Sequence, residues 1–247
     1  MELNNIVIIL CRPEESRNIG AVCRAMANND IHTLRIVGKK EDVDIEKVHV
    51  LAIHAGYIFD NAEFYDSITE ASKDCTICAG TTRRKGKKRM GKLLLPEEFA
   101  SFADKITSSK NKKENGGKVA VVFGNERTGL EDDELAECSM GVTIPSSDEF
   151  GSLNLSHAVQ IMCYHLFRTK SKDKNGYTPV DLKRLDETVD NICDNLQKIG
   201  FFKVSGRKDM ENFWRSILSR SALSEGEAQY LEKTFTKAAG LVSKQND

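Results

Sequence analysis

Short apolar runs alternate with helical patterns over the first 170 residues, and this alternation constrains the fold more than any other feature of the chain. Strands separated by helices of this length pair in parallel and are covered by helices on both faces. The sequence therefore predicts an α/β domain built on a largely parallel sheet. The expected strands are Ile6–Leu10, Thr33–Val37, Thr76–Ala79, Val119–Phe123 and Val142–Ile144. The expected helices are Ile19–Asn28, Ile45–Gly56, Glu63–Ser72, Glu97–Lys105, Asp132–Cys138 and Leu153–Arg168.

A polar, lysine-rich segment, TKSKDKNGYTP, follows from Thr169 to Pro179 and has the composition of a linker. Three helical patterns without strand signals come after it. The first carries a narrow apolar stripe at steps of three and four, and the last opens with Ser224 and Glu227 at the spacing of a capping box. We expect an α/β domain over residues 1–170, a linker over 171–180 and a small all-helical domain over 181–247.

Composition excludes a membrane protein. The 247 residues are 40% apolar and 30% charged, as in globular proteins with a substantial core. No run approaches the ~20 apolar residues of a membrane span, and the N-terminus lacks the pattern of a signal peptide. Seven cysteines, an odd number, favour reduced thiols. We therefore expect a cytoplasmic protein.

No metal site is expected from the cysteines and histidines. Cys75 and Cys78 form a C-x-x-C inside the run CTICAG. If this run is a strand, the two side chains point to opposite faces, which suits neither a metal nor a disulfide. We expect core positions instead. The five histidines form no H-E-x-x-H motif.

The stretch VAVVFGNERTGLEDDEL, from Val119 to Leu135, runs from a strand through a glycine-bracketed turn into an acidic helical segment. Turns of this kind hold nucleotides in many α/β proteins. This one contains neither the Gly-Lys-Ser/Thr of a P-loop nor the G-x-G-x-x-G of a dinucleotide site. The sequence therefore lacks the signature of a nicotinamide oxidoreductase. The turn still predicts a ligand site at the end of this strand.

Two further helix entries fall at the same edge of the predicted sheet, in SRNIGAVCRAMANN and IPSSDEFGSLNLSHAVQI. Each polar candidate has a local alternative: Asn18 and Ser152 as helix caps, Arg24 as a surface arginine, and Glu126 with Arg127 as a salt bridge. Together the three entries supply backbone N–H groups, an amide, a carboxylate and an arginine, without a lysine for a triphosphate. This set suits a cofactor without phosphate and a substrate that carries one.

The segments NIGAVCRAM, VVFGNERTGL and IPSSDEFGSLNLSHAVQI resemble, in order and spacing, the three signature motifs of SpoU-type RNA 2′-O-ribose methyltransferases, in the SPOUT class. The match spans the predicted α/β domain. The helical tail, with its segment WRSILSRSALSEGEA, is similar to that of the TrmJ group, whose members methylate a ribose at the start of the tRNA anticodon loop. Arg17 departs from the pattern, in which a glycine often precedes Asn-Ile-Gly.

The resemblance implies a SPOUT methyltransferase domain with a C-terminal trefoil knot, although knots are exceptional among folds. It implies S-adenosyl-L-methionine as the cofactor, bordered by the backbone of Thr81, Gly124, Ile144 and Leu153. It also implies a homodimer, in which Arg24 or Asn18 reaches toward a site that the partner chain completes.

The candidate catalytic residues are Asn18, Arg24, Glu126, Ser152 and Asn154. A ribose hydroxyl is a weak nucleophile that must be held in line with the methyl carbon and lose its proton. Because a guanidinium stays protonated in proteins, we expect Arg24 to clamp the phosphate of the target nucleotide. We expect the other catalytic candidates to shape the pocket and orient this clamp.

The segment RRKGKKRMGK, from Arg83 to Lys92, carries seven basic residues in ten, within a chain whose net charge is −1. Such a segment is either solvated surface or an electrostatic footprint for an RNA backbone. The RNA-binding candidates are Arg17, Arg83, Arg84, Lys85, Lys87 and Lys88. Phe213 and Trp214 in the tail are candidates for stacking on bases, with core packing as their alternative.

We therefore expect 2′-O-ribose methylation of tRNA, at a cytidine or uridine at position 32 of the anticodon loop. The catalytic motifs leave an rRNA 2′-O-methyltransferase open, because only the tail favours tRNA. A non-catalytic RNA-binding protein with this fold is the alternative from another class.

Overall fold

The computed structural model describes residues 1–84, 93–108, 116–169, 179–202 and 206–243. Its strands are β1 Ile6–Cys11, β2 Thr33–Val37, β3 Glu63–Tyr65, β4 Ile77–Thr81, β5 Leu93–Leu94, β6 Val119–Phe123 and β7 Met140–Val142. Its α-helices are α1 Ser16–Ala27, α2 Ile45–Ala52, α3 Gly56–Asp60, α4 Ile68–Ser72, α5 Pro96–Thr107, α6 Asp132–Ala136, α7 Leu155–Arg168, α8 Leu182–Lys198, α9 Arg207–Ser221 and α10 Glu225–Ser243. The predicted alternation of strands and helices is confirmed.

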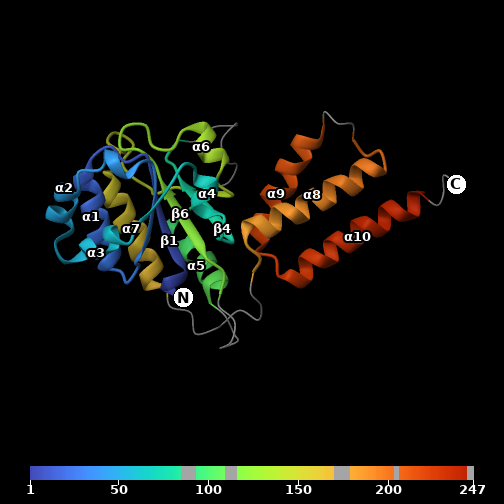
Figure 1. Ribbon diagram of the computed structural model, residues 1–247, viewed down its shortest axis with the longest axis horizontal. Helices are drawn as coiled ribbons and strands as arrows, with labels where there is room; N and C mark the ends of the chain where they lie inside the picture. The colour runs from blue at the N-terminus through green and yellow to red at the C-terminus, as the bar shows by residue number, and fades with distance from the viewer. Residues whose placement is uncertain (85–92, 109–115, 170–178, 203–205, 244–247) are drawn as a thin grey trace.

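All the strands join one parallel sheet, in the order β3-β2-β1-β6-β4-β7-β5 (Figure 1). The register pairs Leu10 with Phe123 and Thr81 with Val142. The carboxyl ends of β1, β6, β4 and β7 therefore meet at one edge. Open parallel sheets bind ligands at this edge.

Alternation along the strands divides the core into two layers. Ile8 and Val121 belong to the layer that α1, α5 and α7 cover. Val7 and Val122 point the other way, into the layer that α4 and α6 cover. The parallel sheet is thus buried on both faces, which explains why β1 and β6 read as continuous apolar runs.

The helix predicted over Glu63–Ser72 is wrong in its first part. Residues Glu63–Tyr65 form the edge strand β3 beside β2, where Glu63 accepts from Arg35 Nε over 3.2 Å. The helix begins only after Ser67, whose side chain accepts from the backbone N–H of Glu70. Tertiary pairing therefore overrides the helical pattern here.

Other element boundaries also differ from the prediction. The helix predicted over Ile45–Gly56 is interrupted at Ile53, where φ is +53°. Strand β7 spans Met140–Val142, so it lies two residues before the predicted strand Val142–Ile144 and shares only Val142 with it. Strand β5 is too short a run to be recognised from its sequence.

All seven cysteines are free and buried, which confirms the core positions of Cys75 and Cys78. The expectation that these two side chains point to opposite faces is wrong. Cys75 precedes β4 instead of lying in it, so the alternation rule does not relate the two residues, and both join the same core layer.

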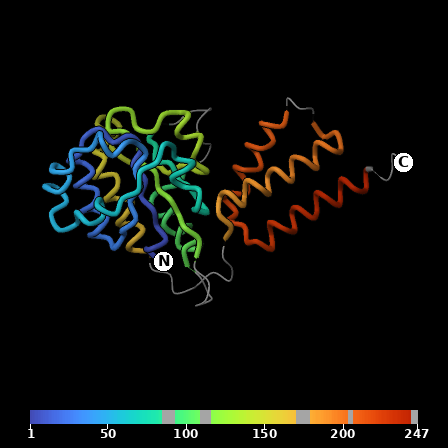
Figure 2. The backbone as a smooth tube through the Cα atoms, viewed as in Figure 1, coloured from blue at the N-terminus to red at the C-terminus, as the bar shows by residue number. Residues whose placement is uncertain are grey.

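Helices α8, α9 and α10 enclose a third apolar cluster beside the α/β part (Figures 1 and 2). The predicted capping box is confirmed: Ser224 Oγ accepts from the Glu227 N–H over 3.2 Å, and Glu227 accepts from the Ser224 N–H over 2.8 Å. Leu182, at the start of α8, donates its N–H to the Cys75 carbonyl over 2.8 Å and enters the core layer under α4 and α6. The start of the helical tail is therefore packed into the core layer between the sheet and helices α4 and α6.

Candidate active site

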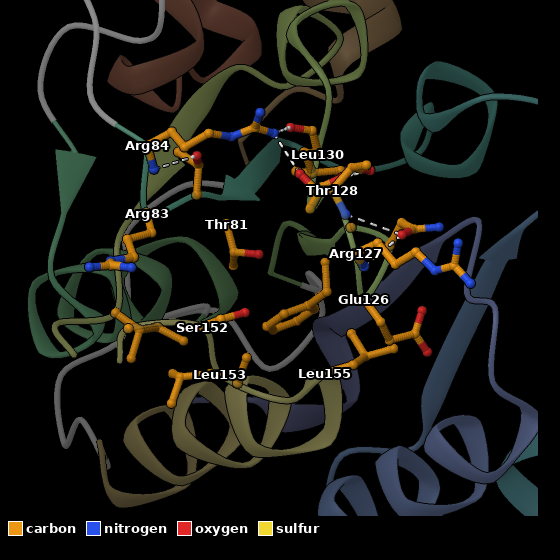
Figure 3. A pocket seen from close by; sticks show the side chains of 18 residues that line it. Thr81, Arg83, Arg84, Glu126, Arg127, Thr128, Leu130, Ser152, Leu153 and Leu155 are labelled. Carbon is orange, nitrogen blue, oxygen red and sulfur yellow. Dashed lines mark hydrogen bonds between the residues drawn. The ribbon is translucent and has the colours of Figure 1, made fainter. Parts of the chain in front are cut away.

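A pocket of about 520 Å³ opens at the carboxyl ends of β4, β6 and β7 (Figure 3). All four residues predicted to border the cofactor line it: Thr81, Gly124, Ile144 and Leu153. Its volume is in the range of small-molecule sites. The pocket therefore lies at the edge of the sheet where the sequence predicted a ligand site. It is bordered by the second motif, which begins in β6, and by the third motif, which follows β7.

The turn after β6 is closed on itself by Asn125. The Asn125 side-chain oxygen accepts from the Arg127 N–H over 2.8 Å, and its backbone carbonyl accepts from the Gly129 N–H over 2.8 Å. A Cβ at Gly124 would come within 2.2 Å of the Leu130 nitrogen, so the turn itself requires this glycine. Sequence reasoning missed Asn125, although side-chain bonds from Asn to the backbone two residues on are typical of turns.

Three candidate residues from three separate motifs form a hydrogen-bonded chain. Asn18 Nδ2 donates to Glu126 Oε1 over 3.0 Å, and Asn154 Nδ2 donates to Asn18 Oδ1 over 3.0 Å. Glu126 also accepts from the backbone N–H of Glu14 over 2.9 Å. The carboxylate thus ties the entry of α1 to the turn after β6, and Asn18 extends the link to α7.

The local alternatives for these residues are mostly wrong. The cap of α1 is Glu15, not Asn18, and the cap of α7 is Asn154, not Ser152. Arg127 pairs with Glu14 over 2.9 Å instead of with Glu126.

Ser152 lines the pocket, whereas Arg24 lies exposed on α1 and outside the pocket lining. Arg24 follows Asn18 by roughly 1.7 helical turns, so the two side chains leave the helix on different faces. Within one chain, hydrogen bonds join Asn18 and Asn154 to Glu126, and Glu126 and Ser152 line the pocket. Arg24 belongs to neither group.

The basic candidates divide into three groups. Arg83 and Arg84 line the pocket and donate to backbone carbonyls of neighbouring loops. Arg17 is exposed near the start of α1. Lys85, Lys87 and Lys88 lie outside the described residues.

A second link between loops, which sequence reasoning missed, joins the end of β1 to α6. Glu134 accepts from Arg12 Nε and from the Cys11 thiol, the latter over 3.1 Å. Burial opposes the charged form of Glu134, but the bond from Arg12 holds the pKa of this carboxyl below its ordinary value. Burial, with the nearby Glu134, raises the pKa of the Cys11 thiol to about 12. Cys11 is therefore protonated at neutral pH and is not a nucleophile.

In the parts of the chain that the structure describes, no group of three or more His, Cys, Asp or Glu side chains is placed to hold a metal ion. Over the same residues, no helix is both long and apolar enough to cross a bilayer.

Comparison with known proteins assigns the chain to a family. Residues 5–164 match the model of the SpoU rRNA Methylase family. A Methanocaldococcus jannaschii protein named tRNA (cytidine-2′-O-)-methyltransferase TrmJ is 36% identical over 236 residues, covering 93% of this chain and 98% of the relative. A Pseudomonas aeruginosa protein named tRNA (cytidine/uridine/adenosine-2′-O-)-methyltransferase TrmJ is 30% identical over 263 residues, covering 99% of both.

Among solved structures, the crystal structure of TrmJ from Z. mobilis ZM4 superposes with a TM-score of 0.69 at 26% identity, covering 94% of this chain and 98% of that one. The motif match, the parallel sheet and these relatives agree. The chain belongs to the SpoU methylase family of RNA methyltransferases.

Proposed function

We propose that this protein methylates the 2′-hydroxyl of a ribose in tRNA with S-adenosylmethionine as the methyl donor. The observation that carries the proposal is the bonded chain of Glu126, Asn18 and Asn154 beside a pocket lined by residues of the second and third motifs. Relatives that match this chain over nearly its full length, tail included, are named as tRNA 2′-O-methyltransferases. The proposed target is a cytidine or uridine at position 32 of the anticodon loop.

The pocket fits S-adenosylmethionine in size and in chemistry. It combines apolar side chains, such as Phe123 and Leu155, with backbone of a glycine-containing turn, which suits an adenine ring and its polar edge. Thr81, Gly124, Ile144 and Leu153 would hold the cofactor. When bound, S-adenosylmethionine supplies an already activated methyl group, so methyl transfer does not require a metal ion.

The protein's own contribution is to hold the ribose 2′-hydroxyl in line with the methyl group, and the hydroxyl proton passes to the clamped phosphate or to a neighbouring group. Glu126 is the candidate catalytic residue with a carboxylate, and it lines the pocket. Its oxygens already accept from Asn18 and from the backbone of Glu14. We therefore assign Glu126 to orientation of α1 and the turn. Ser152, free to face the pocket, is assigned to substrate contact, and Arg24 to the phosphate clamp.

A homodimer would bring Arg24 to a pocket. Arg24 is exposed on α1, against which α2 packs so closely that a Cβ at Gly20 would come 2.2 Å from the Val48 carbonyl oxygen. Apolar side chains are exposed on α2 and the segment after it, at Ile45, Val50, Leu51, Ile53 and Tyr57. Exposed apolar patches of this kind mark association surfaces. We propose that a second copy covers this surface and receives Arg24 at its own pocket. Light scattering of Val50→Asp, which should be monomeric, tests this.

Three further features remain part of the proposal. They are the C-terminal trefoil knot, the division into residues 1–170 and 181–247 around a linker, and a cytoplasmic location, which the seven free thiols support.

The test is incubation of the purified chain with total tRNA and labelled S-adenosylmethionine, followed by mapping of the labelled nucleotide. A parallel incubation uses ribosomal RNA in place of tRNA, and label there instead of in tRNA would favour an rRNA methyltransferase. Binding of tRNA without methyl transfer would favour the non-catalytic alternative. Calorimetry with S-adenosylmethionine and with NAD separates the proposed cofactor from a nicotinamide.

A further inference from the structure

Arg83 and Arg84 lie in the loop after β4, which ends at Thr81, and both line the pocket. Strand β4 lies between β6 and β7 in the sheet. The chain that leaves β4 therefore passes between the loop after β6 and the loop after β7. Figure 3 shows the two arginine side chains extending in different directions from this point.

Arg84 reaches the loop after β6. Its Nη2 donates to the carbonyl oxygen of Thr128 over 2.6 Å and to that of Leu130 over 2.7 Å (Figure 3). Thr128 and Leu130 also line the pocket. Two charge-assisted bonds from one nitrogen fix the orientation of the turn as well as its position.

Arg83 makes the corresponding contacts with the loop after β7. Its Nη2 donates to the carbonyl oxygens of Ser147, over 3.2 Å, and Asp148, over 3.3 Å. The guanidinium lies against Gly151, where a Cβ would come 2.0 Å from Arg83 Cζ. Gly151 directly precedes Ser152 in the pocket lining. Each arginine thus holds one of the two loops that carry the candidate site residues.

We infer that Arg83 and Arg84 are positioning residues that brace the two sides of the cofactor pocket, and that pocket geometry, rather than RNA binding, is their main role. In both residues the carbonyl oxygens take both N–H groups of Nη2, the part of a guanidinium that a bidentate phosphate contact would use. The identity of the cofactor in this inference rests on the proposed function.

The test is calorimetric titration of S-adenosylmethionine into the full-length protein and its Arg83→Ala and Arg84→Ala variants. We expect each variant to bind at least roughly tenfold more weakly, because the carbonyls it releases belong to the pocket walls. Arg84→Lys should regain part of the affinity, because an ammonium can also donate to two carbonyls. Arg168→Ala is the matched control: this arginine is exposed at the far end of α7, where it stacks on Tyr164, and it should bind as the unmodified chain does.

The salt dependence of tRNA binding separates a brace from a phosphate contact. A brace leaves the slope of log affinity against log salt unchanged, whereas loss of one phosphate contact reduces it by about 0.7–0.9. Unchanged cofactor affinity in both alanine variants, or a reduced slope with normal cofactor affinity, would overturn the inference while leaving the proposed function intact. If the unmodified chain itself bound no S-adenosylmethionine, the proposed function and the brace would both be rejected. Should Arg84→Ala unfold, Arg84→Lys in the folded protein gives the same comparison.

Discussion

Asn18 and Glu126, which are 108 residues apart in the chain, are joined by a 3.0 Å hydrogen bond. Because a carboxylate can only accept, the Asn18 amide must present Nδ2 to Glu126 and its oxygen to Asn154. The carboxylate therefore sets the orientation of the Asn18 amide. The Asn154 amide, whose oxygen accepts from the Ser156 N–H, is left with its Nδ2 to donate to Asn18, and the chain links α1 to α7.

Asn18→Asp should lower kcat/KM for tRNA methylation by roughly a hundredfold, about 2.7 kcal/mol. The substitution places a second carboxylate against Glu126 and removes the donor that orients the chain. Asn28→Asp, at the exposed end of the same helix, makes the same charge change away from the pocket and should retain activity. Equal rates for the two variants would argue against the chain's role.

Arg24→Ala should abolish turnover, with a loss of about 4 kcal/mol or more in transition-state stabilisation, a thousandfold in rate. The side chain is exposed, so its removal opens no core cavity, and S-adenosylmethionine binding and dimerisation should survive. Arg24→Lys should rescue little, because lysine lacks the planar fork. If the alanine variant kept most of its rate, the phosphate clamp would belong to another residue.

Neutralising Lys85, Lys87 and Lys88 together should weaken tRNA binding and flatten its salt dependence, because each phosphate contact releases counterions. Cofactor affinity, measured by calorimetry, should hardly change. An unaltered salt slope would return this segment to solvated surface.

Leu182→Ala should lower the free energy of unfolding by about 2–4 kcal/mol. Leu182 is 4% exposed and fills the core layer beneath α4 and α6. Leu241→Ala, at a position that is 57% exposed, is the control and should change stability by less than about 0.5 kcal/mol. Urea denaturation measures both.

Removal of residues 171–247 also removes Leu182. The truncated protein should fold and bind cofactor with reduced stability, and it should methylate tRNA poorly. An insoluble product would place the tail within the core and contradict the proposed domain boundary.

Acid should destabilise the protein through Asp74. The bond from Arg35, supported by Lys118 and opposed by burial, holds the pKa of Asp74 well below its ordinary value. A carboxyl with a lowered folded-state pKa contributes stability above its unfolded pKa of about 3.9, and this contribution is lost as the pH falls below that value. Urea denaturation from pH 7 to pH 3 should show a smaller acid-dependent loss in Arg35→Met. The same pH dependence in both proteins would exclude this pair as the cause.

Two interior strands of the sheet could be predicted in full from the sequence alone. Thr33–Val37 and Val119–Phe123 were predicted with the bounds that the structure has, because buried parallel strands are continuous apolar runs. The edge strand Glu63–Tyr65 could not, because it is half-exposed and depends on pairing with β2. The motif residues could be identified, but not which of them touch.

The sequence by itself determined the alternation of strands and helices, the capping box at Ser224 and the loops that carry the candidate site. Only the tertiary structure decided that Asn18 bonds to Glu126 and that Arg24 lies outside the pocket lining of its own chain. It also decided that Arg83 and Arg84 donate to carbonyls of two different loops. The physical reason is range. Periodicity and caps act over a few residues, whereas these contacts depend on β6 and β4 lying between β1 and β7, an order that local patterns do not encode.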